Sequence, residues 1–223
     1  MRVNESGRSM IEMLGVLAII GVLSVGGIAG YSKAMNKFKT NKVADNVSML
    51  VANIKTLYAQ QNTYAGLNNG TAVSMGVVPD ELGTAYNGAK ATLTNAFNGR
   101  VWINVANSTE ANDHKAFVIE FDGLSREACI TLSTNDWGSG YSSGLIGLKV
   151  TGNGTAQNYA QPTARDASID GLFIGNAGTK ATAGSAIATP GGSAQSVPLA
   201  VTDAAVACNC SKGNTCAIMW KYY

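Results

Sequence analysis

The stretch that decides the fold lies near the amino terminus and reads Ser6-Gly7-Arg8-Ser9-Met10-Ile11-Glu12. An apolar run continues from it, and the 22 residues from Met10 to Tyr31 carry a single charged side chain, Glu12. As a helix such a run is ~33 Å long, enough to cross the ~30 Å hydrocarbon core of a bilayer. A carboxylate costs ~2.5–3.5 kcal/mol or more near the membrane centre. We therefore expect Glu12 to have a partner, and a mature amino terminus beside it could be that partner.

The simplest alternatives are a plain signal anchor and a secretory signal peptide. A secretory signal has a basic start, an apolar centre and a cleavage site with small residues after that centre. The run here is longer than such a centre, carries Glu12 near its start and continues into a helix without a break. These features argue against a secretory signal.

The order of Gly7, four residues, Glu12 and a long apolar helix resembles the cleavage and assembly signal of type IV prepilins. The resemblance implies that prepilin peptidase cuts between Gly7 and Arg8 and methylates the new amino terminus, so that Glu12 becomes the fifth mature residue. Arg8 is a departure, because the family usually has an apolar first mature residue. The expected segments are a leader at 1–7, a transmembrane or fibre-core helix at 8–31, an amphipathic half of the same helix at 32–61 and a globular head at 62–223.

Composition excludes several classes of function. Charged residues make up 13% of the chain against a usual ~25%, and the net charge is +2. Because basic residues do not cluster with aromatic ones, nucleic-acid binding has no support. The Gly-flanked Ser139 lacks the spacing of a nucleophile elbow, and His114, the only histidine, lies in a charged stretch that we expect to be solvated. Asp166 and Asp170 are too sparse to predict a calcium site. We expect no enzyme activity and no cofactor.

All four cysteines follow the apolar run, at Cys129, Cys208, Cys210 and Cys216. An even number of cysteines in an exported domain indicates two disulfides, and the Cys208-x-Cys210 spacing does not fit a zinc site, so no metal is expected. Four lysines between residues 33 and 42 would favour the opposite membrane orientation by the positive-inside rule. Large domains translocate regardless of flanking charge, and the cysteines favour an exported head.

One helix is predicted from Met10 to about Gln61, because no proline interrupts it. Five glycines in its apolar half weaken it by up to ~1 kcal/mol each and leave room for close helix contact. After Tyr31 the apolar residues recur every three or four positions, which predicts one stripe that packs on a sheet. The stripe contains Val43, Val47, Leu50, Val51, Ile54, Leu57 and Tyr58.

The head shows an α+β order. After a loop at 62–88, with a turn at Asn68-Asn69-Gly70 and a short helix near Pro79, β-branched and aromatic runs predict a hairpin of strands at 101–105 and 116–121. Asp122-Gly123 should end the second strand, and Ser125 should cap a short helix at 125–132. Further strands are expected at 145–150, 172–174, 206–210 and 215–220, with a composition close to that of a linker at 179–196. The order Asn98-Gly99, strand, Phe121-Asp122-Gly123-Leu124, Ala128-Cys129 is similar to that of the type IVb pilins.

Two pairings of the cysteines are favoured, Cys129–Cys208 and Cys210–Cys216. The resemblance supports a bridge from near Cys129 to the carboxyl-terminal region. The second pairing rests on spacing alone, as a clip across a terminal hairpin whose last strand lies inside the sheet. Four cysteines permit three connectivities, which stay open at this point.

The sequence is therefore interpreted as an α+β chain with a type IV pilin fold: a long amino-terminal helix against an antiparallel sheet, with a disulfide-bonded carboxyl-terminal region. The resemblance implies a subunit that polymerises with copies of itself. The other implied partners are prepilin peptidase, the inner-membrane assembly machinery and, before assembly, the membrane. The alternatives are a minor pilin or a type II secretion pseudopilin and, from another class, a membrane-anchored periplasmic binding protein.

Overall fold

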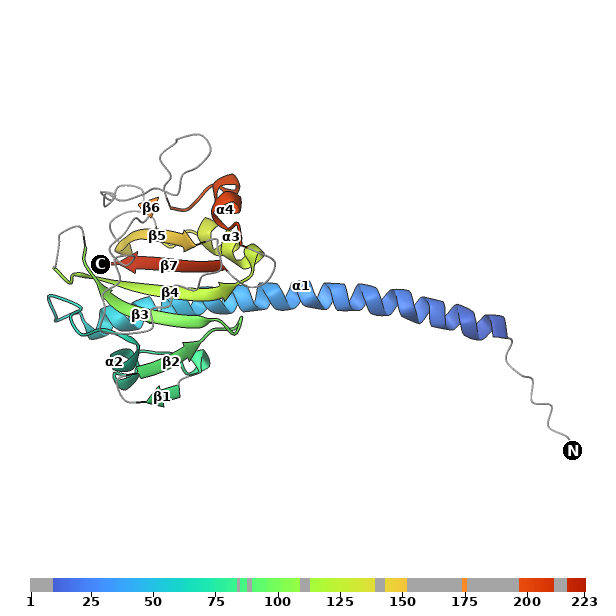
Figure 1. Ribbon diagram of the computed structural model, residues 1–223, viewed down its shortest axis with the longest axis horizontal. Helices are drawn as coiled ribbons and strands as arrows, with labels where there is room; N and C mark the ends of the chain where they lie inside the picture. Colours follow the sequence, from blue (N-terminus) through green and yellow to red (C-terminus); the bar gives the residue numbers. More distant parts are fainter. Residues whose placement is uncertain are drawn as a thin grey trace, which may run out of the picture. The chain divides into compact units, whose positions relative to one another are not determined.

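The computed structural model describes residues 10–83, 85–87, 90–108, 113–138, 143–151, 174–175, 197–210 and 216–223. The chain divides into two compact units, Met1–Phe38 and Lys39–Tyr223. From here on, the head means the second unit, which includes the carboxyl end of the long helix together with the head expected at 62–223. Helix α1 (Met10–Leu57) begins in the first unit and ends in the second (Figure 1).

Helix α1 forms because its sequence contains no proline and satisfies its own polar groups. Within the apolar run, the Ser24 hydroxyl donates to the carbonyl of Ile20, so that no polar side-chain group is left without an internal partner at that point. The helix ends at Leu57, and the predicted end near Gln61 was wrong. After Leu57 the chain turns, with the Gln61 amide bonded to the Tyr58 carbonyl at 2.8 Å.

The described strands form one antiparallel sheet in the order β1-β2-β3-β4-β7-β5-β6 (Figure 1). Their bounds are β1 Ala85–Asn87, β2 Lys90–Thr94, β3 Arg100–Ala106, β4 Ala116–Leu124, β5 Leu145–Thr151, β6 Ile174–Gly175 and β7 Cys216–Tyr222. The predicted hairpin is confirmed, because β3 and β4 pair in one continuous register from Val101–Phe121 to Ala106–Ala116. The prediction for the last strand is also confirmed: β7 lies between β4 and β5, and all seven of its residues are buried.

The remaining elements are short helices. They are α2 (Asn69–Ser74), a 3-10 turn (Asp80–Leu82), α3 (Arg126–Thr134) and α4 (Val201–Ala207). Helix α3 begins as predicted, because the Ser125 hydroxyl accepts a hydrogen bond from the Ala128 amide. The short helix expected near Pro79 is the 3-10 turn, which Pro79 precedes.

The core lies between the amphipathic half of α1 and one face of the sheet. Val43, Val47, Leu50 and Ile54 of the predicted stripe are fully buried, and they belong to one cluster with Phe117 and other side chains of the sheet. Leu57, also part of the predicted stripe, is 45% exposed. Alternate residues of the same strands reach the other face, where Ala106, Ala116, Val118, Ile146 and Met219 form a second cluster. Strands β4 and β7 are therefore buried on both faces and lack the polar alternation of a surface strand.

Two predictions near the cysteines were wrong. Strand β4 does not end at Asp122-Gly123 but passes through an irregularity in its pairing with β7 and continues to Leu124, with Gly123 at φ +68°. Residues 206–210 are not a strand, because Val201–Ala207 form α4. A short apolar run fits either period, and here the buried face of Ala204 and Ala207 is a helical one.

Two further differences concern the segment after α1. Asn68-Asn69-Gly70 is not a turn: Asn68 is the N-cap of α2, and its side chain accepts from the Thr71 amide. Asparagine suits both roles because its side chain bonds nearby backbone groups. Strands β1 and β2 were not predicted, and β1 lies within the expected loop at 62–88.

Of the strand expected at 172–174, Ile174 lies in β6 and the other two residues are outside the described part, as is the linker-like stretch at 179–196.

Candidate assembly site

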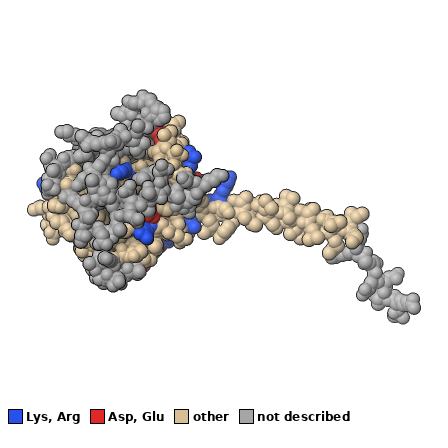
Figure 2. Space-filling view, in the orientation of Figure 1, with Lys and Arg blue, Asp and Glu red and all other residues tan. Residues whose placement is uncertain are grey.

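The apolar half of α1 presents large hydrophobic side chains to solvent. Among the described residues α1 is the one helix that is long and apolar enough to cross a membrane, by length and composition alone. Met10 is 84% exposed, Leu17 62% and Val25 71%, so the chain itself leaves these side chains uncovered. Figure 2 shows this part of the helix as a surface without Lys or Arg. Such a surface is stable in water only when lipid or protein covers it.

Glu12 lies in the first turn of α1, two residues after its start, and is exposed. A carboxylate at this end of a helix is favoured, because the unpaired backbone N–H groups carry partial positive charge. Gly7 and Arg8, the two residues of the expected cleavage site, lie outside the described residues.

The glycines of the apolar half have no structural reason within the chain. A Cβ added at Gly15, Gly21, Gly26, Gly27 or Gly30 would meet nothing within 4 Å. The contrast is Gly99 in the head, whose added Cβ would lie 2.6 Å from the backbone carbon of Asp122. Each helical glycine weakens a helix relative to alanine. The five glycines therefore destabilise α1, and no close packing among the described residues requires them.

The Lys55 side chain attaches the carboxyl end of α1 to the rest of the head. The Lys55 ammonium donates to the Ser143 carbonyl at 2.8 Å and lies 5.1 Å from the centre of the Tyr222 ring. Burial lowers the pKa of Lys55 and raises the pKa of Tyr222, since each environment disfavours the charged form. The arrangement holds the carboxyl end of α1 against β7.

The segments that resemble the type IVb pilins meet in space. Gly99 packs on the backbone of Asp122, and the Asp122 carboxylate accepts from the Arg100 amide. The Asn95 side chain closes the junction by donating to the Asp122 carbonyl at 2.8 Å and accepting from the Phe97 and Gly99 amides. Burial raises the pKa of Asp122, although its hydrogen bond to Arg100 and the Arg100 charge oppose the rise. Asn95 was not predicted as a functional residue, because its partner Asp122 lies 27 residues away.

The disulfides follow the favoured pairing. Cys129 of α3 bonds Cys208 at the end of α4, with an S–S distance of 2.04 Å and a Cα–Cα distance of 5.9 Å. Cys210 bonds Cys216 of β7 across a Cα–Cα distance of 5.4 Å. The second bridge does not clip a hairpin, because α4 rather than a strand precedes it.

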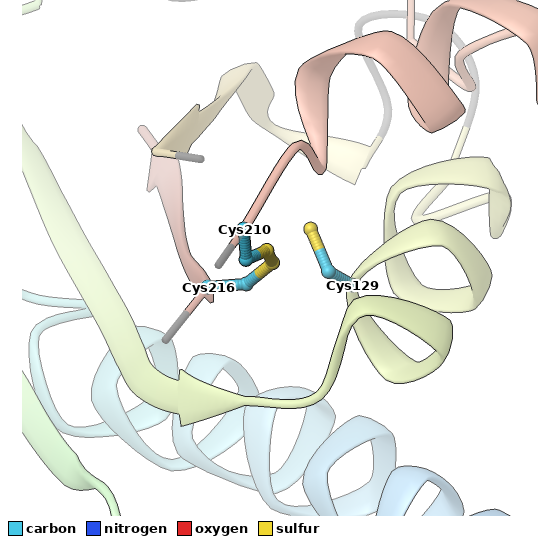
Figure 3. Close-up of side chains that lie close together, drawn as sticks. All are labelled: Cys129, Cys210 and Cys216. Atoms are coloured by element: carbon cyan, nitrogen blue, oxygen red, sulfur yellow. A yellow bond between two sulfur atoms is a disulfide. The ribbon is translucent and has the colours of Figure 1, made fainter. Parts of the chain in front are cut away.

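The sulfurs of the two bridges lie close together. The Sγ atoms of Cys129, Cys210 and Cys216 lie within 4.8 Å of one another, and Figure 3 shows the Cys129 sulfur beside the Cys210–Cys216 bridge. Among the described residues this is the one group of His, Cys, Asp and Glu side chains close enough to hold a metal ion. Metals bind cysteine as thiolate, so bonding of every cysteine in a disulfide leaves this group without metal ligands.

Of the other side chains noted in the sequence, His114 is the one that lies in the described part of the chain. His114 is half-buried, its amide bonds the Asn107 side chain, and its carbonyl accepts from Tyr64. Ser139, Asp166 and Asp170 lie outside the described residues.

A long helix, apolar in its first half and amphipathic in its second, with a head of one antiparallel sheet and carboxyl-terminal disulfides, defines a type IV pilin. The chain belongs to the family described as PilS N terminal, whose model matches residues 37–170. That match begins after the apolar run and so does not include Gly7, Arg8 or Glu12.

The chain is also similar to individual proteins. The chain is 24% identical over 175 residues to the major structural subunit of bundle-forming pilus of Escherichia coli O127:H6, an alignment that covers 78% of this chain and 86% of that protein. It is 25% identical over 134 residues to the toxin coregulated pilin of Vibrio cholerae, covering 60% and 59%. A crystal structure of a type IVb pilin from Salmonella typhi matches 78% of this chain and 93% of its own, with 14% identity and a TM-score of 0.45.

Proposed function

We propose that the chain is the structural subunit of a type IVb-like pilus, which polymerises with copies of itself through the apolar half of α1. The observation that carries the proposal is the exposed apolar surface from Met10 to Tyr31, with glycines at which an added Cβ would meet nothing within 4 Å. Small residues let helix backbones approach closely, so these glycines gain a purpose when copies of α1 pack together. The E. coli relative is named as a major pilus subunit, which supports the same role for this chain.

Maturation is the first step of the proposal. Prepilin peptidase cuts between Gly7 and Arg8 and methylates the new amino terminus. Before the cut, the apolar half of α1 holds the precursor in the inner membrane with its head in the periplasm. The inner-membrane assembly machinery then moves the subunit from lipid into the growing filament, which extends outside the cell.

Glu12 sets the register of the subunits. Inside a bundle of apolar helices, its carboxylate pairs with the new amine of a neighbouring subunit. Leaving one charge of such a buried pair without its partner costs about 3–5 kcal/mol. A subunit that docks one helical turn out of register loses the pair, so the correct register is favoured by roughly 100-fold or more in the binding constant. The head takes no part in this pairing, has a structural role without catalysis, and binds neither cofactor nor nucleic acid.

The test replaces Glu12 in cells that contain the assembly machinery. In Glu12→Ala, the cut after Gly7 still occurs, but the filament fraction sheared from the cells loses the subunit, which accumulates in the membrane. Glu127→Gln is the matched control, because Glu127 is an exposed carboxylate of the head, and this variant should assemble normally. Normal assembly of Glu12→Ala would contradict the pairing of Glu12 with the new amine. Absence of the wild-type chain from the sheared filaments would favour a membrane-anchored periplasmic binding protein. Assembly as a trace component beside another major subunit would favour a minor pilin or a pseudopilin.

A further inference from the structure

The two disulfides differ in their access to solution. Cys129, Cys208 and Cys216 are fully buried, whereas Cys210 is half-buried. Access for a thiolate from solution is therefore through Cys210 and not through the fully buried Cys129–Cys208 bridge. Because thiol–disulfide exchange requires contact between the attacking sulfur and a bonded one, access decides where a reaction from outside begins.

The two bridges also contact each other. The Sγ atoms of Cys210 and Cys216 each lie within 4.8 Å of the Cys129 Sγ. Figure 3 shows the Cys129 side chain beside the Cys210–Cys216 bridge. The backbone brings the second bridge to the first, because the Cys210 sulfur lies 3.4 Å and the Cys216 sulfur 4.0 Å from the carbonyl oxygen of Cys208. Both sulfurs of the Cys210–Cys216 bridge therefore lie near the Cys129 sulfur of the Cys129–Cys208 bridge.

We propose that the four cysteines form one thiol–disulfide exchange centre, in which an external thiol enters at Cys210 and the exchange passes to the buried Cys129–Cys208 bridge. The external reactant is a small thiol or the thiolate of an oxidoreductase. This inference concerns the chemistry of the head and does not depend on polymerisation.

The steps balance without an added oxidant or reductant. The external thiolate attacks the Cys210 sulfur, which forms a mixed disulfide at Cys210 and releases Cys216 as a thiolate. Cys216 then attacks the nearby Cys129 sulfur, which forms a Cys129–Cys216 bond, breaks the Cys129–Cys208 bond and releases Cys208 as a thiolate. Cys208 finally attacks the Cys210 sulfur of the mixed disulfide, which forms a Cys208–Cys210 bond and returns the external thiolate. The reverse sequence restores the native pairing, so the centre can correct a mispaired head without unfolding it.

The experiment makes the attack of an external thiolate on Cys210 unnecessary, because a free thiol is already present on the chain. In the full chain with Cys210→Ser, Cys216 is left as a free thiol beside the intact Cys129–Cys208 bridge. The protein is held folded in detergent at about pH 8 with an alkylating reagent that traps released thiols. Its bridges and alkylated cysteines are then mapped by mass spectrometry without reduction. We expect bridges that contain Cys216 and alkylation at Cys129 or Cys208, at a rate that dilution of the protein does not change.

The matched control is Ser48→Cys, which adds an exposed thiol on α1 and leaves both bridges in place. This thiol should become alkylated with no change in pairing. The proposal is overturned if, in Cys210→Ser, Cys129–Cys208 stays the only bridge while an unfolded sample of the same variant exchanges readily. Should Cys210→Ser fail to fold, the wild-type chain is treated with limiting glutathione. Alkylation at Cys129 or Cys208 then supports the exchange centre, and alkylation confined to Cys210 and Cys216 overturns it.

Discussion

Removal of the Cys129–Cys208 bridge should destabilise the head far more than removal of Cys210–Cys216. The first bridge spans a sequence separation of 79 residues and the second a separation of 6. In the chain-entropy model a bridge restricts the unfolded chain by an amount that grows with the logarithm of the closed loop, which gives about 4.5 kcal/mol for the long loop and about 2.2 kcal/mol for the short one. Native domains are stable by only about 5–15 kcal/mol, so loss of the long bridge leaves the head marginal.

The comparison uses two double variants, Cys129→Ala with Cys208→Ala and Cys210→Ala with Cys216→Ala. Each deletes two sulfurs and keeps the other bridge, so neither variant has a free thiol. Urea unfolding of the full chain in mild detergent is followed by tryptophan fluorescence, which reports on the head because Trp220 is fully buried there. The long-bridge variant should lose about 2 kcal/mol more than the short-bridge variant, and its two buried cysteines add a cavity cost in the same direction.

Equal losses in the two variants, or a larger loss in the short-bridge variant, would refute this reasoning. Either result would mean that loop closure in the unfolded chain does not decide the contribution of these bridges. Local packing of the outer bridge against the carbonyl of Cys208 would then be the dominant effect.

Three further substitutions test the head. Asp122→Asn should stabilise the head at pH 7. Burial raises the pKa of Asp122, so the stability of the wild-type head falls as pH rises from the unfolded-state pKa through the folded-state pKa, whereas the asparagine of the variant does not titrate. In urea titrations of both proteins, the advantage of the variant should vanish below about pH 3.9. Gly99→Ala should cost about 1–3 kcal/mol, because its Cβ would overlap the Asp122 backbone, whereas Gly27→Ala should leave the urea midpoint of the head unchanged. Leu50→Ala should lower the free energy of unfolding by about 2–5 kcal/mol, because Leu50 is fully buried. The neighbouring Met49 is 47% exposed, so Met49→Ala should cost under about 0.5 kcal/mol. Similar losses for the two variants would contradict the packing of α1.

The features that could be predicted from the sequence are those with a long or simple pattern. The apolar run and the stripe at Val43, Val47, Leu50 and Ile54 repeat over many turns, so α1 and its buried face were predicted almost to the final turn. The strongly β-branched strands β3 and β4 were also recognised. Strand β7 was predicted to lie inside the sheet, and all seven of its residues are buried.

The features that were missed depend on partners distant in sequence. Asn69 looks like a turn residue, yet its side chain donates to the carbonyls of Ala91 and Val101 and accepts from the Ile103 amide, which holds α2 against β2 and β3. No local pattern contains these bonds. Helix α4 is too short for its period to distinguish it from a strand, and only its packing against α3 makes it a helix.

The cysteines show the same division. Their number and export context indicate two bridges. The resemblance to pilins favours Cys129–Cys208, and spacing favours Cys210–Cys216, which is the pairing that the structure has. The contact between the two bridges, on which the exchange centre rests, requires α4 to deliver Cys208 and Cys210 to the start of β7. The strand that was predicted at 206–210 implies a different arrangement of the two bridges from the one that α4 produces.

The central claim is that this chain matures and assembles through its amino-terminal helix. The most direct measurement is the intact mass, without reduction, of subunits from filaments sheared off cells that produce the protein. The account predicts a chain that lacks residues 1–7, is one methyl group heavier than the cut sequence, and lacks the four cysteine hydrogens that two disulfides remove. An uncut chain, or a chain cut beyond the apolar run, would contradict the claim, because the amine that pairs with Glu12 would then not exist.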